Sequence, residues 1–440
     1  MNPSVRNRAL SAQGVSHKSV GPPFGRAQML LTRQRLTAGE LYVWFVALTT
    51  LIAQGGRFSV LGFNLGGWMW VLPSLVAIAC LMLCRRRWAL PFIAFLPFLA
   101  YMALRTDSLS QDAVQRVGLF MSPVLVGAAA SQLRLGSARS VRNAYTVLFF
   151  ASVALYAAGV VQQKTFRLGG WYSIGGASKT FALLGVAAVA ESQWRSRRGY
   201  VALALIWTLC FVSASRMPAM VLPAVLILGS SRLTVHRRLA LSVAIIAGGL
   251  LLLFPSKPMQ RMLFRSGEGT FAELLELDPS RLHSGGRLTA WPMYIDAIRK
   301  SDFLLGAGGL ESTRFGGETF GGWSHPHNEY IRLVFEYGAI GAALYLGSLL
   351  YLLGSCYRRR RSGPPELLWL WHVGWVGLVA FMLLAVTGNT FVYAPFIGNM
   401  LFVTIGAAFA VSSETYEHHS LIERYKLRIF RPRPAVAARV

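Results

Sequence analysis

The sequence predicts an all-α polytopic membrane protein with about twelve transmembrane helices and one large external loop. Hydrophobic residues make up 54% of the 440 residues and charged residues only 14%, a balance typical of membrane proteins rather than soluble domains. Apolar runs recur along the chain, and clusters of basic residues separate them. The net charge of +26 therefore indicates loops beside anionic lipid headgroups, and we expect membrane lipids but no nucleic acid as partners.

Polarity divides the chain into five segments. Residues 1–40 form a basic tail, 41–254 hold the N-terminal transmembrane helices, 255–327 form the polar loop, 328–411 hold the C-terminal transmembrane helices, and 412–440 form a second basic tail. The first tail lacks a short apolar core followed by a small-residue cleavage site. We therefore expect a retained cytoplasmic tail rather than a signal peptide.

Each apolar run is expected to be a helix, because lipid offers no partner to an unpaired backbone group. The expected helices are 41–55, 68–84, 88–104, 117–133, 144–162, 177–192, 199–214, 217–231, 239–254, 328–354, 366–387 and 394–411. The four cysteines lie in or at the ends of these runs and form no CxxC pair. They predict neither a disulfide framework nor a metal site.

Basic residues in alternate loops set the orientation, because lysine and arginine resist translocation. One set of loops carries the two tails and clusters at 85–87, 134–142, 195–198, 232–238 and 358–361. This pattern predicts that both termini are cytoplasmic and that residues 255–326 are external. Residues 200–228 form one long apolar stretch, and as a single helix it would measure roughly 43 Å, more than the bilayer core of about 30 Å. Since both flanks are basic, we predict a tight hairpin that turns at 213–218 and places Arg216 at the external boundary.

The external loop carries similar numbers of acidic and basic residues, so it is not a polyanion-binding surface. Residues 288–298 show the apolar spacing of an amphipathic helix that lies on the membrane. Arg287 precedes this helix after Gly285 and Gly286, where free backbone N–H groups add to its attraction for phosphate. Arg281 is a supporting basic candidate in the same loop.

A histidine-bearing segment, SHPHNEYIRLVFEYGAIG at 324–341, joins this loop to the next apolar helix. A histidine at a water–membrane boundary can titrate near neutral pH and reach a lipid-borne substrate. The alternative is that His325 and His327 only cap an interfacial helix. Of the acidic residues, essentially only Glu336 is expected within an apolar segment. Arg216 either extends to the interface or, with few acidic partners, meets an anionic ligand such as a diphosphate.

Together, these motifs resemble the O-antigen ligase and polymerase superfamily. The resemblance rests on SASR at the hairpin, GGRLTAW at the external helix, FLLGAGG after it, and HPHN before EYGAIG. The motifs cover roughly residues 200–347. The predicted arrangement, with twelve spans and both termini cytoplasmic, extends the resemblance to the whole chain. His327, Asn328, Gly338 and Gly341 match the family pattern, whereas Ala342 departs from its last position. The family's loop arginine is often followed four residues later by leucine, where this chain has Trp291.

The resemblance implies glycan transfer at the periplasmic face of a bacterial inner membrane, with 255–327 as the periplasmic loop. The donor would be an undecaprenyl diphosphate-linked glycan and the acceptor a lipid A-core or glycan hydroxyl. His327 would be the catalytic general base, and Arg216 and Arg287 would bind the diphosphate. Asn328 and Glu336 would orient His327, with His325 in a weaker, structural role. The expected chemistry needs no cofactor and no metal.

Three alternatives stay open at this point. A polymerase of O-antigen or exopolysaccharide would share most of the pattern. Glu276 and Asp278 of ELLELDP would instead hold a divalent cation against the diphosphate, although two carboxylates beside a proline more often form a solvated turn. A polysaccharide transporter or flippase would perform no covalent chemistry, but proton-coupled carriers usually place carboxylates within their spans.

Overall fold

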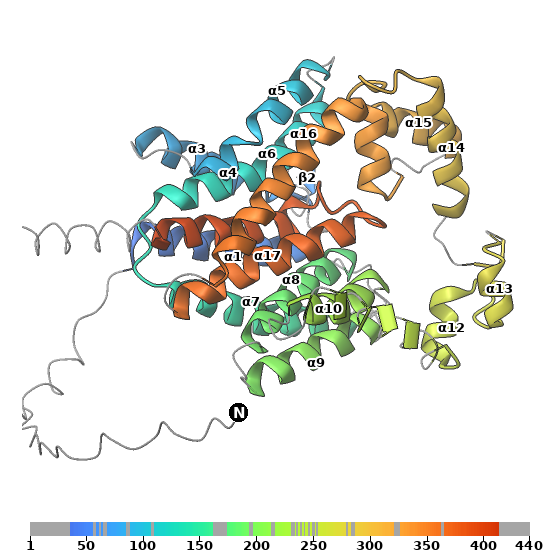
Figure 1. Cartoon of the computed structure of the whole chain (residues 1–440), viewed down its shortest axis with the longest axis horizontal. Helices are drawn as coiled ribbons and strands as arrows, with labels where there is room; N and C mark the ends of the chain where they lie inside the picture. Colours follow the sequence, from blue (N-terminus) through green and yellow to red (C-terminus); the bar gives the residue numbers. More distant parts are fainter. Residues whose placement is uncertain are drawn as a thin grey trace, which may run out of the picture. The chain divides into compact units, whose positions relative to one another are not determined.

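Most of the expected helices form where the apolar runs lie, as the computed structural model shows (Figure 1). The structure describes residues 36–55, 59–60, 63–64, 68–84, 89–106, 110–161, 174–192, 197–212, 216–229, 234, 236–237, 240–241, 243–244, 247–248, 251, 254–278, 280–282, 287–320, 326–361 and 365–412. Half of the predicted helix 239–254 lies outside these residues.

The N-terminal half contributes α1 (Ala38–Gln54), α3 (Val71–Leu83), α4 (Leu90–Ile93), α5 (Leu96–Leu104), α6 (Gln111–Gln132), α7 (Ala138–Val161), α8 (Ile174–Ser192), α9 (Arg197–Val212) and α10 (Arg216–Gly229). The polar loop contributes α12 (Lys257–Leu263), α13 (Phe271–Leu275), α14 (Arg287–Lys300) and α15 (Glu311–Phe320). The C-terminal part contributes α16 (Glu329–Arg359), α17 (Pro365–Ala385) and the π-helix η3 (Ala394–Gly398), which continues as a helix to Ser412. Strands β1 (Ser59–Val60) and β2 (Phe63–Asn64) form a short antiparallel pair.

Five of the described helices are long and apolar enough to cross a membrane: Gln111–Gln132, Ala138–Val161, Glu329–Arg359, Leu367–Ala385 and Ala394–Ser412. Shorter apolar helices cover Ala38–Gln54, Val71–Leu83, Leu90–Leu104 and Met217–Gly229. The protein is therefore an all-α membrane protein, and a total of twelve spans stays a prediction.

The predicted hairpin forms from two separate helices, α9 and α10. The indole N–H of Trp207 in α9 donates to the carbonyl of Ala219 in α10 over 2.9 Å. These residues are twelve positions apart and would lie about 18 Å apart along one continuous helix. The contact therefore shows that the chain turns back on itself between them.

The expected helix 88–104 is interrupted between α4 and α5. Pro97 lies in the first turn of α5, and its ring does not tolerate a helical carbonyl four residues earlier. The carbonyl of Ala94, at the interruption, accepts a hydrogen bond of 2.6 Å from the hydroxyl of Ser348 in α16. A neighbouring helix thus donates a hydrogen bond to a backbone carbonyl at the interruption.

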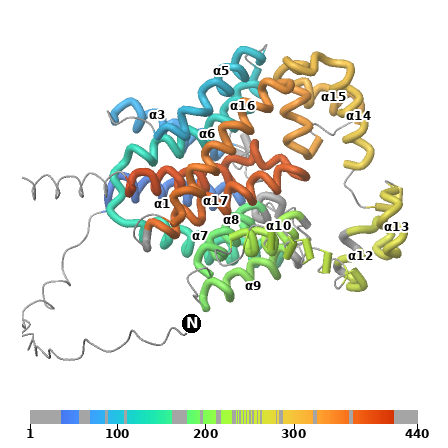
Figure 2. The backbone as a smooth tube through the Cα atoms, viewed as in Figure 1, coloured from blue at the N-terminus to red at the C-terminus, as the bar shows by residue number. Residues whose placement is uncertain are grey.

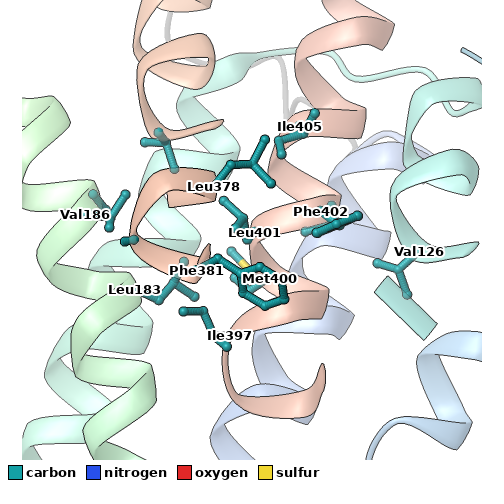
Figure 3. Packing of buried hydrophobic residues seen from close by; sticks show 14 of the residues in the cluster. Val126, Leu183, Val186, Leu378, Phe381, Ile397, Met400, Leu401, Phe402 and Ile405 are labelled. Carbon is teal, nitrogen blue, oxygen red and sulfur yellow. The ribbon is translucent and has the colours of Figure 1, made fainter. Parts of the chain in front are cut away.

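The helix that begins at η3 lies in the centre of the bundle. Its side chains Ile397, Met400, Leu401, Phe402 and Ile405 are almost fully buried. Figure 3 shows them against Leu183 and Val186 of α8, Leu378 and Phe381 of α17, and Val126 of α6. Figure 2 shows this red segment beside the blue α1, so the ends of the described chain share one core.

Candidate functional site

The site lies at the start of α16, where the polar loop enters the bundle. Figure 1 shows α14 and α15 grouped near one end of α16, which itself passes α5 and α17. Asn328 caps α16, because its side-chain oxygen accepts from the N–H groups of Tyr330 at 3.0 Å and Ile331 at 3.1 Å. On the other side, the indole N–H of Trp291 in α14 donates to the carbonyl of Pro326 over 2.8 Å. The segment between these two attachments contains His327.

His327 has a backbone φ of 51°, in the left-handed region that non-glycine residues rarely occupy. Such conformations persist only where the surroundings enforce them, and they cluster at active sites. The imidazole is half-buried. Burial, followed by the positive charges of Arg287, Lys179 and Arg332, lowers the pKa of His327 to about 4. The neutral imidazole therefore prevails at neutral pH, and this is the form that accepts a proton.

Arg287, which the sequence predicted as a phosphate-binding residue, is the first residue of α14. Its side chain is half-buried, and burial lowers the pKa of its guanidinium, which nevertheless stays protonated because arginine starts from a very high value. Its charge acts on the imidazole of His327. The structure thus brings together the predicted base and one of the two predicted cations.

Lys179 of α8 is a third cation of the site, and the sequence interpretation did not single it out. Its ammonium lies 2.9 Å from the centroid of the Tyr393 ring, a cation–π contact beside η3. The signal was present, because a single lysine stands near the start of the largely apolar helix 177–192. Charged residues inside such helices usually mark a functional path or a paired site.

A buried network of ion pairs lies along one face of α16, in the turns that follow the Asn328 cap. The carboxylate of Glu336, fully buried, accepts from Arg116 of α6 at 2.9 and 3.2 Å. It also accepts from the hydroxyl of Ser312 in α15, and Arg332 lies 4.0 Å away. Arg116 donates in addition to Thr313 over 2.9 Å. Glu336, expected to orient His327, therefore joins α6, α15 and α16.

Arg332 and Glu329 form the second ion pair of this network, and both are buried. The guanidinium of Arg332 lies 5.5 Å from the centroid of the Phe120 ring. The expectation that essentially only Glu336 is an acidic residue within an apolar helix was therefore wrong, because Glu329 opens the same helix. The spacing of Glu329, Arg332 and Glu336 could have predicted their ion pairing, since residues three and four apart share a helix face.

Arg116 was missed for a different reason. The predicted helix began at 117, but α6 begins at Gln111, where Ser110 caps it by accepting from the N–H of Ala113. The added turn and a half carries Arg116 into the buried interior. A polar stretch before an apolar run can thus belong to the helix when a serine supplies the cap.

The backbone conformation of Gly338 explains why the family pattern has a glycine at this position. It interrupts α16 with φ 64° and ψ −171°, a conformation open almost only to glycine. The N–H groups of Ala339 and Ile340 donate to the carbonyls of Phe303 and Leu304 at 2.9 and 3.2 Å. On the other side of the break, the carbonyls of Phe335 and Glu336 accept from Ala307 and Gly308 at 2.8 and 3.0 Å. Backbone hydrogen bonds at this interruption therefore join the polar loop to the helix bundle.

The amphipathic helix predicted at 288–298 forms as α14, but its buried face differs from the predicted apolar stripe. Tyr294 and Ala290 are its buried residues, and Tyr294 packs against Phe315, Phe320 and Phe335. The hydroxyl of Tyr294 donates to the Ser312 carbonyl over 2.7 Å. This face of α14 is therefore used against α15 and α16, while Ile295 stays exposed.

Of the other three predicted residues, only the side chain of Arg281 is described. Arg216 is the first residue of α10, and its side chain lies outside the description, as does the whole of His325. Arg281 is exposed and forms an ion pair with Glu273 at 2.9 Å, with Asp278 and Glu276 at 3.7 and 4.0 Å. Its partners are thus nearby acidic residues of the polar loop.

The alternative metal site involved two of these acidic residues, Glu276 and Asp278. Both oxygens of Asp278 accept from Ser280, one from its N–H and one from its hydroxyl, each at 2.8 Å. These hydrogen bonds and the charge of Arg281 lower the pKa of Asp278. Asp278 thus forms the solvated turn that its proline neighbour favours. Within the described ranges, no three His, Cys, Asp or Glu residues group together as metal ligands would.

Residues 179–346 match the model of the protein family described as O-antigen ligase. The matched segment runs from Lys179 through the polar loop and past Gly341. It contains Lys179, Arg287 and His327, whereas Arg116 and Tyr393 lie outside it. Among the curated proteins compared with the chain, none matches it.

Proposed function

We propose that this chain, which its segment 179–346 places in the O-antigen ligase superfamily, transfers a glycan from undecaprenyl diphosphate to an acceptor hydroxyl at the periplasmic face of the inner membrane. It is a multi-pass membrane protein of the glycosyl-transferring ligase or polymerase kind. The acceptor we favour is a sugar of lipid A-core.

His327 is the general base of the proposed reaction. It takes the proton of the acceptor hydroxyl as that oxygen forms its bond to the anomeric carbon of the donor sugar. The bond from this carbon to the diphosphate breaks, and its electron pair leaves with the carrier. The observation that carries the proposal is the position of His327, a half-buried residue held in a left-handed backbone conformation between the attachments of Pro326 and Asn328, within the electrostatic influence of Arg287.

Arg287 and Arg216 neutralise the departing diphosphate. A guanidinium can grip two phosphate oxygens at once, and positive groups fixed in advance lower the cost of charge that develops in the transition state. The position of Arg287 at the first turn of α14 supports this role, because a helix N-terminus also favours anions. Arg216 enters the proposal from the sequence alone.

Because these arginines neutralise the diphosphate, its departure as the leaving group needs no metal ion. We therefore propose that transfer continues in EDTA. Loss of activity in EDTA, followed by rescue with a divalent ion, would return the chemistry to the Glu276 and Asp278 alternative.

The test is transfer by the purified full-length protein in liposomes that contain carrier-linked glycan and acceptor. A base contributes about 10²–10⁴ in rate, whereas a helix cap contributes about 1 kcal/mol of stability. His327→Ala is expected to insert normally, to bind donor, and to transfer at least a hundredfold more slowly, whereas His325→Ala has a milder effect. Near-normal turnover by His327→Ala would remove the proposed base.

The same assay separates the rival classes. A transporter or flippase would move the carrier-linked glycan without any covalent attachment to acceptor. In cells, deletion of the gene separates ligase from polymerase through the lipopolysaccharide pattern on a gel. Loss of all long chains is expected for a ligase, and retention of a single repeat would identify a polymerase.

A further inference from the structure

A short apolar turn, Phe303–Leu305, follows α14 and presents its side chains outward. The exposed fractions are 60% for Phe303, 58% for Leu304 and 40% for Leu305. Three consecutive exposed apolar residues are unusual on a surface that faces only water. The proposed reaction assigns no role to this turn.

The turn is held in place by hydrogen bonds to its carbonyl groups and to the N–H groups of Leu304 and Leu305. The side chain of Asp302 accepts from the N–H groups of Leu304 and Leu305 at 2.9 and 3.0 Å. The carbonyls of Phe303 and Leu304 accept from α16 across the Gly338 interruption. The carbonyl of Leu305 accepts from the hydroxyl of Tyr101 over 3.2 Å.

The next residue completes this attachment. The N–H of Gly306 donates to the carbonyl of Asp302 over 2.7 Å, and the carbonyl of Gly306 accepts from Arg105 over 2.9 Å. All carbonyl groups from Asp302 to Gly306 are thus hydrogen-bonded. In hydrocarbon, an unpaired polar group finds no hydrogen-bond partner. A non-helical segment can therefore approach lipid only when its carbonyl groups are already hydrogen-bonded within the protein.

The surroundings of the turn indicate what covers it. It is attached to the end of α5, whose last residue Leu104 is 81% exposed, and to α16, where Ile340 is 40% exposed. The helix α16 is long and apolar enough to cross a membrane, and α5 belongs to a shorter apolar segment. The apolar side chains of the turn therefore continue an apolar surface that α16 and the apolar helix α5 already present.

Charged residues lie on the other side of the turn. Arg299 and Lys300 end α14 just before it, and both are exposed. Basic side chains next to apolar ones are typical of segments that lie at the boundary between headgroups and acyl chains. Along the chain, the side chains thus change from cationic at the end of α14 to apolar in the turn.

We propose that Phe303, Leu304 and Leu305 insert into the acyl-chain region of the bilayer leaflet beside the polar loop. This contact anchors the loop to the membrane at the level of Gly338. Because α14 leads directly into the turn, the anchor also fixes the height of α14 above the lipid. The partner is the bilayer itself, recognised by burial of apolar surface.

The test uses the full-length protein with Cys80, Cys84, Cys210 and Cys356 replaced by serine or alanine. Leu304→Cys carries a polarity-sensitive nitrobenzoxadiazole label, and the protein is reconstituted in phosphatidylcholine–phosphatidylglycerol vesicles. Some vesicles contain lipids with a doxyl group on the acyl chain. Leu104→Cys serves as the control for lipid exposure, and Thr319→Cys, exposed on α15, serves as the control for water.

The expected result at position 304 is a blue-shifted emission that doxyl lipids quench at least twofold and that aqueous iodide does not quench. Position 319 should show the reverse. Quenching by iodide alone at 304 would place the turn in water and overturn the proposal. Quenching by neither agent, with a signal that depends on the protein-to-lipid ratio, would identify a second copy of the chain as the partner and would also overturn it. Phe303→Cys repeats the measurement independently.

Discussion

At the scale of single residues, the site combines one imidazole with several fixed positive charges. Arg287, Lys179 and Arg332 all disfavour protonation of His327, and burial disfavours it further. A histidine in water would be partly protonated near pH 6.5 and would lose its capacity as a base below that value. The surroundings of His327 therefore keep its imidazole neutral down to lower pH, and the same lowered pKa makes it a weaker base than a histidine in water.

This electrostatic arrangement predicts the position of the acid limb of the pH profile. Activity requires the neutral base, so kcat/KM should fall as pH decreases through the pKa of the free enzyme, at about 4 rather than 6.5. Arg287→Gln removes one positive charge, raises the pKa of His327 and should move the limb to higher pH. The profile is measured at constant ionic strength, and Arg299→Gln, exposed on the same helix, should leave the limb in place. A wild-type limb at pH 6.5 would contradict the prediction.

A second prediction at this scale concerns the proposed diphosphate contacts. Arg287→Lys and Arg216→Lys keep the positive charge but lose the planar fork that holds two oxygens. Each is expected to lower transfer at least tenfold, about 1.4 kcal/mol or more, at normal protein levels. Arg299→Lys is the matched control. Unchanged rates in both variants would mean that these arginines only extend to the interface.

At the scale of elements, α16 is two helices that meet at a glycine. A Cβ atom on Gly338 would lie 2.1 Å from the carbonyl oxygen of Leu304, and one on Gly306 would lie 2.4 Å from the N atom of Gly338. The two backbones therefore touch where the polar loop crosses the helix. Gly341 is also close-packed, because its Cβ would lie 3.1 Å from the Tyr101 ring. Both glycines of the family pattern thus permit close approach.

Gly338→Ala should accordingly destabilise the protein strongly. The backbone conformation alone costs an L-residue about 1–3 kcal/mol, and the overlap with Leu304 adds to this. Thermal unfolding in detergent should show a clear drop in Tm. Gly347→Ala, on the same helix with open space around the added methyl group, should keep or raise Tm because alanine favours helices. Equal Tm values for the two variants would mean that the interruption is not required.

The ion pair between Arg116 and Glu336 allows a test of coupling between elements. Glu336→Gln leaves a buried guanidinium without its counter-charge, which typically costs about 3–5 kcal/mol. Removal of both charges in Arg116→Gln with Glu336→Gln avoids that cost. We therefore expect the double variant to be more stable than the sum of the single variants predicts, by Tm and by yield of folded protein. Additive losses would show that the pair is not energetically coupled.

The sequence predicted most helices because apolar runs and basic clusters reflect the bilayer directly. It could not show the network around Glu336, because this depends on contacts between α6, α15 and α16 that are far apart in the chain. It also gave 328–354 as one uninterrupted helix, since a single glycine within an apolar run does not by itself indicate a break. His327 and Arg287 were predicted as a pair through the family pattern, and only the fold reveals Lys179 beside them.

At the scale of the whole molecule, the basic clusters between apolar helices predict which side each loop faces. Arg85–Arg87, Arg134–Arg142 and Arg358–Arg361 alternate with loops that contain few cations. The polar loop is instead nearly neutral, and its charged residues pair locally, as Arg281 does with Glu273 and Arg314 does with Glu311. A loop of this length translocates largely regardless of its charge, so its basic residues do not oppose an external position.

The last prediction tests this orientation with single cysteines in a background that lacks the native ones. Ser266 and Thr319 lie in the polar loop and are exposed, whereas Ser312, in the same loop, is buried against Glu336 and would label poorly. Ser266→Cys and Thr319→Cys should therefore react with a membrane-impermeant maleimide in intact cells whose outer membrane has been permeabilised. Ser137→Cys, exposed in the basic loop between α6 and α7, should react only after the inner membrane is lysed. The opposite pattern would place His327 and Arg287 on the cytoplasmic side, out of reach of a periplasmic acceptor.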